Sequence, residues 1–263
     1  MVQTWVQAGA GAGARGVHAL SVEGLSKSYG ALVVTQDVSF DVAEHEALGL
    51  IGPNGAGKTT LFNLIAGSTR PNAGRIKVFG RDISQLDARQ RCHLGIARSF
   101  QVPQPFSGMT AYENVLIAAA FGRQLRESAA RPFASEALDR SGLGHLAGRL
   151  AGSLTLLDRK RLELARALAT GPKLLLLDEI AGGLTEAECQ SLIELIREIR
   201  IAGTTIVWVE HVLHALLAVV DKVMVLDFGK IIAQGPPDAI MKDPHVAAVY
   251  LGPDAEDLEA VHG

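Results

Sequence analysis

The segment Gly52-Pro-Asn-Gly-Ala-Gly-Lys58-Thr59-Thr60 constrains the fold of this chain more than any other part of the sequence. The apolar run Ala47-Leu-Gly-Leu-Ile51 before it predicts a buried strand, and apolar residues continue at helical spacing behind it, at Leu61, Phe62, Leu64 and Ile65. The glycines let the backbone turn tightly, so that several N–H groups point at one anion from the start of a helix. A strand, a glycine-rich loop of this spacing and a helix are typical of a site for the phosphates of a nucleoside triphosphate.

This phosphate loop also carries the side chains that such a site needs. Lys58 places a positive charge near the outer phosphates, and Thr59 provides a hydroxyl ligand for Mg²⁺, an ion that keeps most of its waters. The expected cofactors are therefore ATP or GTP, together with Mg²⁺. We expect nucleotide contacts from every residue of the loop, which are Gly52, Pro53, Asn54, Gly55, Ala56, Gly57, Lys58, Thr59 and Thr60.

A second apolar run, Leu174-Leu-Leu-Leu177, ends in two acids, Asp178 and Glu179. It follows the phosphate loop by about 120 residues, and an acid at the end of such a strand is where a phosphate-loop enzyme holds its magnesium. Asp178 is therefore the expected metal-side carboxylate. Glu179 comes directly after it and is placed to act as a general base on an attacking water. The pair predicts hydrolysis of the bound nucleotide.

The order of apolar patterns predicts the architecture. Alternating apolar residues indicate antiparallel strands between residues 19 and 42 and again at 75–79. Continuous apolar strands later alternate with helices, at 174–177, 186–200, 205–209, 212–220 and 223–226. Alanine-rich segments between these regions predict a helical subdomain inserted at about residues 100–157. We expect an α/β protein with a RecA-like parallel-sheet core, an N-terminal antiparallel β subdomain and this helical insertion.

Composition fits one nucleotide-binding unit and excludes other classes. The chain has 263 residues and a net charge of −3, without the long basic runs of a nucleic-acid-binding protein. No apolar stretch approaches the ~18 to 20 residues that span a bilayer, so a membrane role requires partner subunits. Cys92 and Cys189 match no metal spacing and predict reduced thiols. We expect the domain to occupy residues 18–252, with a disordered tail at 1–17 and a C-terminal tail at 253–263.

Together these motifs resemble the ATP-binding subunit of ATP-binding cassette (ABC) transporters, from Leu20 to Gly252. The resemblance implies that Tyr29 stacks on adenine and that His211 is the switch histidine that reaches the γ-phosphate. Gln101 stands at the family's glutamine loop, which contacts the metal or its water and links to the helical subdomain. The implied catalytic residues are Glu179, His211 and Gln101, and the implied metal ligands are Thr59, Gln101 and Asp178.

One departure from the family pattern bears on the site. The family signature reads Leu-Ser-Gly-Gly-Gln, whereas this chain has Leu154-Thr-Leu-Leu-Asp158, so that Leu156 and Leu157 replace both glycines. Thr155 keeps the hydroxyl and is the expected signature contact with the nucleotide. The other interpretation is that Thr155 and Asp158 form a cap that starts the next helix, while main-chain N–H groups still serve the phosphate.

Within the superfamily, several stretches resemble the branched-chain amino-acid uptake group, namely 98–101, 109–116, 209–212 and 243–252. That resemblance implies an importer in which two ATPase subunits, identical or related, work with integral-membrane permeases and an external solute-binding protein. It places the chain peripherally at the cytoplasmic face of the inner (plasma) membrane. Relatives with this C-terminal ending serve urea, other amides, aromatic acids or lipopolysaccharide export, so these solutes remain open.

Two other classes of function compete with a transport ATPase. A phosphate-loop GTPase or small-molecule kinase would share residues 52–60, but the sequence contains no Asn-Lys-x-Asp guanine motif. A kinase would also lack the helix-leading segment at 154–168 and His211. A soluble cassette protein acting on ribosomes or chromosomes usually has two cassettes or a long coiled coil, and this chain has neither. We therefore expect ATP hydrolysis coupled to transport, with no nucleic-acid partner.

Overall fold

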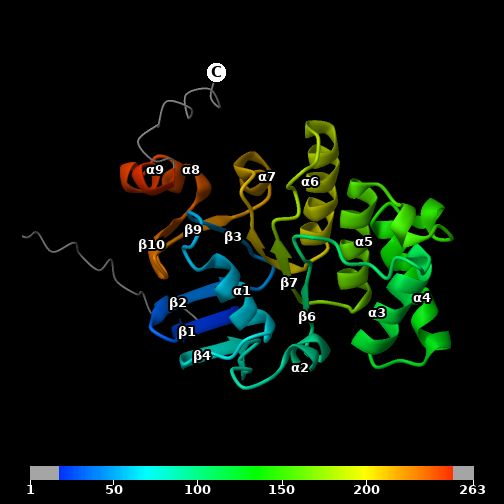
Figure 1. Cartoon of the computed structure of the whole chain (residues 1–263), viewed down its shortest axis with the longest axis horizontal. Coiled ribbons are helices and arrows are strands. Elements are labelled where there is room, and N and C mark those ends of the chain that lie inside the picture. Colours follow the sequence, from blue (N-terminus) through cyan, green and yellow to red (C-terminus); the bar gives the residue numbers. More distant parts are fainter. Residues whose placement is uncertain (1–17, 251–263) are drawn as a thin grey trace, which may run out of the picture.

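The computed structural model describes residues 18–250, and Figure 1 shows how their helices and strands are arranged. The tails predicted at residues 1–17 and 253–263 lie outside the described residues. The predicted architecture is confirmed: an antiparallel sheet, a mainly parallel sheet and a helical insertion occupy separate parts of the chain. Within residues 18–250, no helix combines the length and apolar character that crossing a bilayer requires.

The N-terminal part forms a four-stranded antiparallel sheet in the order β2-β1-β4-β5. Its strands are β1 (His18–Tyr29), β2 (Leu32–Ala43), β4 (Ala73–Val78) and β5 (Arg81–Asp82). The chain turns from β1 to β2 at Gly30, whose positive φ of 60° suits glycine. The alternation of buried and exposed residues along β2 is the pattern of a sheet with one face on the core.

The second sheet has six strands in the order β10-β9-β3-β8-β7-β6. They are β3 (Ala47–Ile51), β6 (Ile96–Arg98), β7 (Leu174–Asp178), β8 (Thr205–Val209), β9 (Lys222–Asp227) and β10 (Lys230–Gly235). All neighbours are parallel except β10, which pairs with β9 in antiparallel fashion. Every residue of β3, β7 and β8 is buried, because helices or the other sheet cover both faces.

Two apolar clusters divide the core between them. One lies between the two sheets and contains α1 (Lys58–Ala66), which begins directly after the phosphate loop. The other covers the opposite face of the parallel sheet and includes α6 (Glu186–Ile201) and α7 (Leu213–Leu217). The helix predicted at 212–220 is shorter in the structure, where α7 covers only Leu213–Leu217. The chain continues through α8 (Pro237–Met241) and α9 (Pro244–Tyr250), at the end of the molecule away from the insertion (Figure 1).

The helical insertion packs as one group beside the edge strand β6 (Figure 1). It contains α3 (Ala111–Gly122), α4 (Glu127–Arg140), two 3₁₀ turns (Gly144–Leu146 and Ala151–Ser153) and α5 (Leu156–Ala169). Buried alanines, among them Ala119, Ala130 and Ala134, allow α3 and α4 to approach closely. A capping box between Thr110 and Glu113 starts α3. The same apolar cluster joins the insertion to α6, so the insertion continues the core.

Arg91, on α2 (Ala88–His93), ties the C-terminal end of α1 to its surroundings. Its guanidinium is fully buried and donates to the last carbonyls of α1, Leu64 O at 2.5 Å and Ile65 O at 2.8 Å. It also donates to Leu86 O and Ser84 O, at 3.0 and 3.3 Å. Burial lowers the pKa of Arg91 to about 10, against the opposing effect of nearby carboxylates. The side chain therefore caps the helix that follows the phosphate loop.

We expect Arg91→Met to lower the free energy of unfolding by roughly 2 to 4 kcal/mol, because it leaves several buried carbonyls without a donor. Chemical denaturation of the full chain measures this difference. Arg89→Met, two residues earlier in α2 and exposed, is the matched control and should change stability by about 0.5 kcal/mol or less. Equal effects of the two substitutions would show that Arg91 does not act through these carbonyls.

Candidate active site

The phosphate loop joins the end of β3 to the start of α1 and packs closely against neighbouring backbone. A Cβ added to Gly52 would lie 2.1 Å from Leu226 O on β9, and one added to Gly57 would lie 2.6 Å from Val34 O on β2. Both glycines also have positive φ, 152° and 102°. The loop conformation therefore needs glycine at these two positions for space as well as for backbone freedom.

The start of α1 is arranged to receive an anion. Gly57 is the N-cap residue and provides no capping side chain, so the first N–H groups of this nine-residue helix have no side-chain acceptor. Lys58 is buried, and its Nζ donates to Gly52 O at 2.5 Å and Pro53 O at 3.0 Å. Burial lowers the pKa of Lys58, while the negative charge of Glu179 acts in the opposite direction. Uncapped N–H groups and a buried ammonium fit the phosphates of a nucleotide.

The acids at the end of β7 have separate partners. Asp178 is buried, and its Oδ2 forms an ion pair with Arg98 Nη2 at the end of β6. Glu179 has a positive φ of 46°, and its N–H donates to Val209 O at 2.8 Å. This left-handed turn aims the Glu179 side chain away from that of Asp178 and toward the loops that follow β6 and β8.

Glu179 contacts the other two predicted catalytic residues, Gln101 and His211. Its Oε1 lies 2.8 Å from His211 Nε2, and its Oε2 accepts a hydrogen bond from Gln101 Nε2. Gln101 follows β6 and His211 follows β8, so parallel strands bring both residues to the carboxyl edge of the sheet. A carboxylate held between an amide and an imidazole is fixed in orientation, which is what a general base for water requires.

Tyr29 and Thr155 are not part of this cluster. Within residues 18–250, no hydrogen bond or ion pair joins either of them to the phosphate loop or to Glu179. Tyr29 ends β1, is 49% exposed, and has the Lys27 ammonium 5.1 Å from its ring centre. Thr155 precedes α5 and is exposed. Both side chains are therefore open to contacts from outside the chain.

The altered signature forms a capped helix start. Thr155 Oγ1 accepts from Asp158 N at 3.2 Å and donates to Asp158 Oδ2 at 2.8 Å, so the predicted cap is present, while a phosphate contact from the main-chain N–H groups stays a prediction. Leu156 and Leu157 are the first residues of α5, where main-chain N–H groups lack helical partners. The Leu156 side chain is 44% exposed and lies beside Gly183, 3.4 Å from a Cβ built there.

Three residues near the acids had no role in the sequence prediction. Arg98 and Glu210 lie inside stretches that supported the family resemblance, and Asn63 lies on α1. Glu210 is buried and accepts from the N–H groups of Ala181 and His211, at 2.9 and 3.0 Å. It thus joins the segment after Glu179 to the segment that carries His211. The family stretches that contain Arg98 and Glu210 could have drawn attention to these two residues. A sequence motif does not show, however, which distant segments a side chain joins.

An aromatic side chain also lies next to the phosphate loop. Phe228, in the turn between β9 and β10, is 87% exposed and has a positive φ of 41°. With Asp227 and Val249 it borders a cavity of about 420 Å³ that residues 53–56 of the loop also line. The sequence prediction missed this wall, because no pattern in residues 227–230 indicates an exposed ring.

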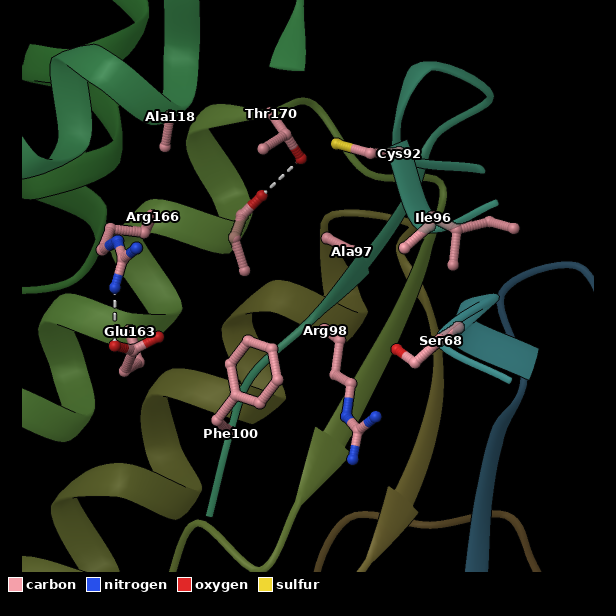
Figure 2. Close-up of a pocket in the computed structure, with 13 residues that line it drawn as sticks. Ser68, Cys92, Ile96, Ala97, Arg98, Phe100, Ala118, Glu163, Arg166 and Thr170 are labelled. Atoms are coloured by element: carbon pink, nitrogen blue, oxygen red, sulfur yellow. Dashed lines mark hydrogen bonds and ion pairs between the residues drawn. The ribbon is translucent and has the colours of Figure 1, made fainter. Parts of the chain in front are cut away.

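A groove lies where the parallel sheet meets the helical insertion (Figure 2). Its volume is about 250 Å³, and its walls come from β6, α2, α3 and α5, with Ile96, Arg98, Phe100, Ala118, Glu163 and Arg166 among the lining residues. Glu163 and Arg166 form an ion pair at 2.7 Å on the α5 side. Phe100 and Arg98 lie on the sheet side, so the groove reaches the segment that carries Gln101.

Comparisons with known sequences agree with this geometry. The sequence model of the ABC transporter family matches residues 35–182, and that of the branched-chain amino acid ATP-binding cassette transporter matches residues 230–254. The chain is 39% identical over 248 residues to the high-affinity branched-chain amino acid transport ATP-binding protein LivG of Salmonella typhimurium, covering 89% of this chain and 97% of LivG. It is 36% identical over 233 residues to the lipopolysaccharide export system ATP-binding protein LptB of Haemophilus influenzae, with the same coverage of 89% and 97%.

Solved structures show the same fold. A nucleotide-free ATP-binding cassette from an ABC transporter superposes with a TM-score of 0.82 at 31% identity, covering 89% of this chain and 99% of that one. The ADP conformation of an ATP-binding cassette gives the same score, identity and coverage. At this similarity, the positions of the strands and of the helical insertion are shared.

The phosphate loop and the acids give separable predictions. Lys58→Ala removes the buried ammonium and should weaken ATP binding, whereas Glu179→Gln should retain binding and lower the rate of hydrolysis by ~10²-fold or more. Nucleotide binding and phosphate release measured on the same preparations distinguish the two effects. Lys77→Ala, on the exposed Lys77–Glu23 pair of the antiparallel sheet, is the control and should leave both unchanged. Full hydrolysis by Glu179→Gln would remove Glu179 from the role of base.

Proposed function

The chain belongs to the ATP-binding cassette family of transporter ATPases, and we propose that it is the ATP-hydrolysing subunit of an importer for branched-chain amino acids. The assignment of ATP hydrolysis rests on one observation: Gln101 and His211 both contact Glu179 beside the phosphate loop. The solute assignment rests on the similarity to LivG and on the match of residues 230–254 to the branched-chain family. The similarity to LptB makes lipopolysaccharide export the second candidate.

In the proposed mechanism, the loop binds ATP and the acids act on water. Lys58 exchanges the carbonyls of Gly52 and Pro53 for the outer phosphates, and the uncapped N–H groups of α1 hold the same charge. Thr59, Asp178 and Gln101 offer the oxygen ligands that Mg²⁺ prefers, and when bound the ion neutralises charge on the phosphates. Glu179 accepts the proton of the attacking water, and His211 stabilises the charge that develops on the γ-phosphate.

We infer that two cassettes act together, each site using the phosphate loop of one subunit and the signature of the other. Thr155 is exposed, and it carries no contact with the phosphate loop of its own chain, nor do the N–H groups of Leu156 and Leu157. A partner's nucleotide can reach these groups, and it would replace Asp158 at the Thr155 hydroxyl. Tyr29, exposed at the end of β1, is free to stack on adenine. ATP then stabilises the closed pair, and hydrolysis allows it to separate.

The membrane partner of this subunit is proposed to bind next to the groove. Phe100, Val102 and Phe106 are 51%, 66% and 50% exposed, and together with the half-buried Met109 they form an apolar patch on the connection from β6 to α3. Exposed apolar clusters of this kind usually mark contacts with another protein. Permease subunits are the fitting partner, since the patch adjoins Gln101 and movement there reaches Glu179 directly. The chain is then a peripheral subunit on the cytoplasmic side, and an external binding protein delivers the solute.

Two experiments test this function, one on membrane binding and one on transport. We expect the chain to sediment with membranes only when its permease subunits are present, because its own described helices cannot span a bilayer. In proteoliposomes that contain the permeases and the solute-binding protein, leucine should stimulate hydrolysis and enter the vesicles, and Phe106→Ser should reduce both. Ile201→Ser, at an exposed apolar residue at the end of α6, is the control. Membrane association that persists without permeases would show that they are not its membrane partner, and a chain that stays in the supernatant when they are present would indicate a soluble function. Stimulation by a different solute would overturn the branched-chain assignment.

The leucines of the signature lead to a separate prediction. If Leu156 and Leu157 prevent the close backbone approach that glycine allows, the isolated chain should hydrolyse ATP ~10²-fold more slowly per site than an assembled pair whose partner has a glycine signature. Leu156→Gly/Leu157→Gly should then raise the rate of the isolated chain. Glu179→Gln in the assembled pair should remove the fast site. Brisk hydrolysis by the isolated chain, unaltered by the two glycines, would show that the N–H groups and Thr155 suffice.

A further inference from the structure

Arg98 connects three elements at the metal side of the site. It ends β6, its Nη2 forms the ion pair with Asp178 at the end of β7, and its Nη1 donates to Asn63 Oδ1 on α1 at 2.6 Å. The side chains of Arg98 and Asp178 are only 11% and 9% exposed. The pair is therefore nearly enclosed by protein, where charges are screened far less than at the surface.

The Arg98 guanidinium is held by packing as well as by this ion pair. Its central carbon lies 5.9 Å from the ring centre of Phe62 and 5.3 Å from that of Phe100, within the range of cation–π contact. Figure 2 shows Arg98 beside Phe100 at the sheet side of the groove. Its Nε is buried and has no hydrogen-bond partner among the described residues. The rings and Asn63 thus keep the cation in place even when Asp178 engages another group.

The position of this cation has a consequence for the metal. A nearly buried carboxylate without a counter-charge is costly, and Arg98 supplies that charge to Asp178. Mg²⁺ that binds at Asp178 brings a second cation to the same carboxylate, and the two positive charges repel each other. Arg98 therefore stabilises the metal-free site relative to the metal-bound one.

We propose that Arg98 is a positioning residue that competes with Mg²⁺ for Asp178. The chain therefore binds Mg²⁺–nucleotide more weakly, and releases Mg²⁺–ADP sooner, than it would with an uncharged side chain at position 98. The inference rests on the proposed role of Asp178 as the metal-side carboxylate. In this role Arg98 does not contact the nucleotide and does not transfer a proton.

The test is a titration of Mg²⁺ against a fluorescent ADP analogue bound to the full-length chain, with binding in EDTA as the metal-free reference. Arg98→Met keeps the length of the side chain and removes the charge. We expect it to lower the half-saturating Mg²⁺ concentration by about tenfold and to slow release of the Mg²⁺-bound analogue to a similar degree. Metal-free binding should stay within about twofold of that of the original chain, since Arg98 does not touch the phosphate loop.

Two further variants separate charge from structure. Arg98→Lys keeps the positive charge and loses the planar fork, so its half-saturating Mg²⁺ concentration should stay within about threefold of the original value. Arg131→Met removes an arginine from the exposed Arg131–Glu127 pair on α4 and should change nothing. If Arg98→Met does not fold, Arg98→Gln carries the same test, because glutamine can still donate to Asn63.

An unchanged or higher Mg²⁺ requirement in Arg98→Met overturns the inference, as does an equal loss of metal-free binding in the Met and Lys variants, which would indicate a purely structural role. Asp178→Asn distinguishes this failure from failure of the proposed site. Loss of Mg²⁺ dependence in Asp178→Asn, with no effect of Arg98→Met, rejects the role of Arg98 alone. Unaltered Mg²⁺ dependence in Asp178→Asn shows that Asp178 is not the metal-side carboxylate.

Discussion

Two adjacent acids at the end of a buried strand are the constraint on which the rest of the site depends. Asp178 and Glu179 follow four buried leucines, and unpaired charges at such a place would be costly. Each carboxylate therefore has its own partners, Arg98 for Asp178, and Gln101 with His211 for Glu179. These protein groups bond to the same carboxylate oxygens that the metal and the attacking water are proposed to use. Lys58 shows the same arrangement, since its ammonium is bound to loop carbonyls.

The partners of these acids link the site to the helical insertion. Arg98 and Gln101 come from one short segment at the end of the edge strand β6, which continues into the exposed patch and then into α3. A displacement of that segment changes the surroundings of both acids at once. Glu210 adds a second connection, because it accepts from the N–H groups of Ala181 and His211. The geometry thus gives the proposed coupling between permease and ATP hydrolysis a short physical path.

The sequence was sufficient for the features that local patterns encode. The phosphate loop, the strand that ends in Asp178 and the helical insertion were predicted because spacing and apolar periodicity mark them directly. Side-chain partnerships were not, since Arg98 and Asp178 are 80 positions apart and meet only when β6 pairs with β7. The three-residue strand β6 is too short for a periodic signal. After α7 ends at Leu217, the N–H groups of Val219 and Val220 donate to Leu216 O at 3.0 and 3.2 Å, so residues 218–220 form a turn that apolar periodicity does not distinguish from helix.

The central claim is that ATP and Mg²⁺ bind by replacing the protein contacts of Lys58, Asp178 and Glu179. An experimental structure of the Glu179→Gln chain with ATP and Mg²⁺ tests it most directly. The account predicts that Lys58 leaves the carbonyls of Gly52 and Pro53 for the phosphates, and that Gln101 and His211 turn from residue 179 toward the metal and the γ-phosphate. Bound nucleotide with all of these contacts unchanged would contradict it.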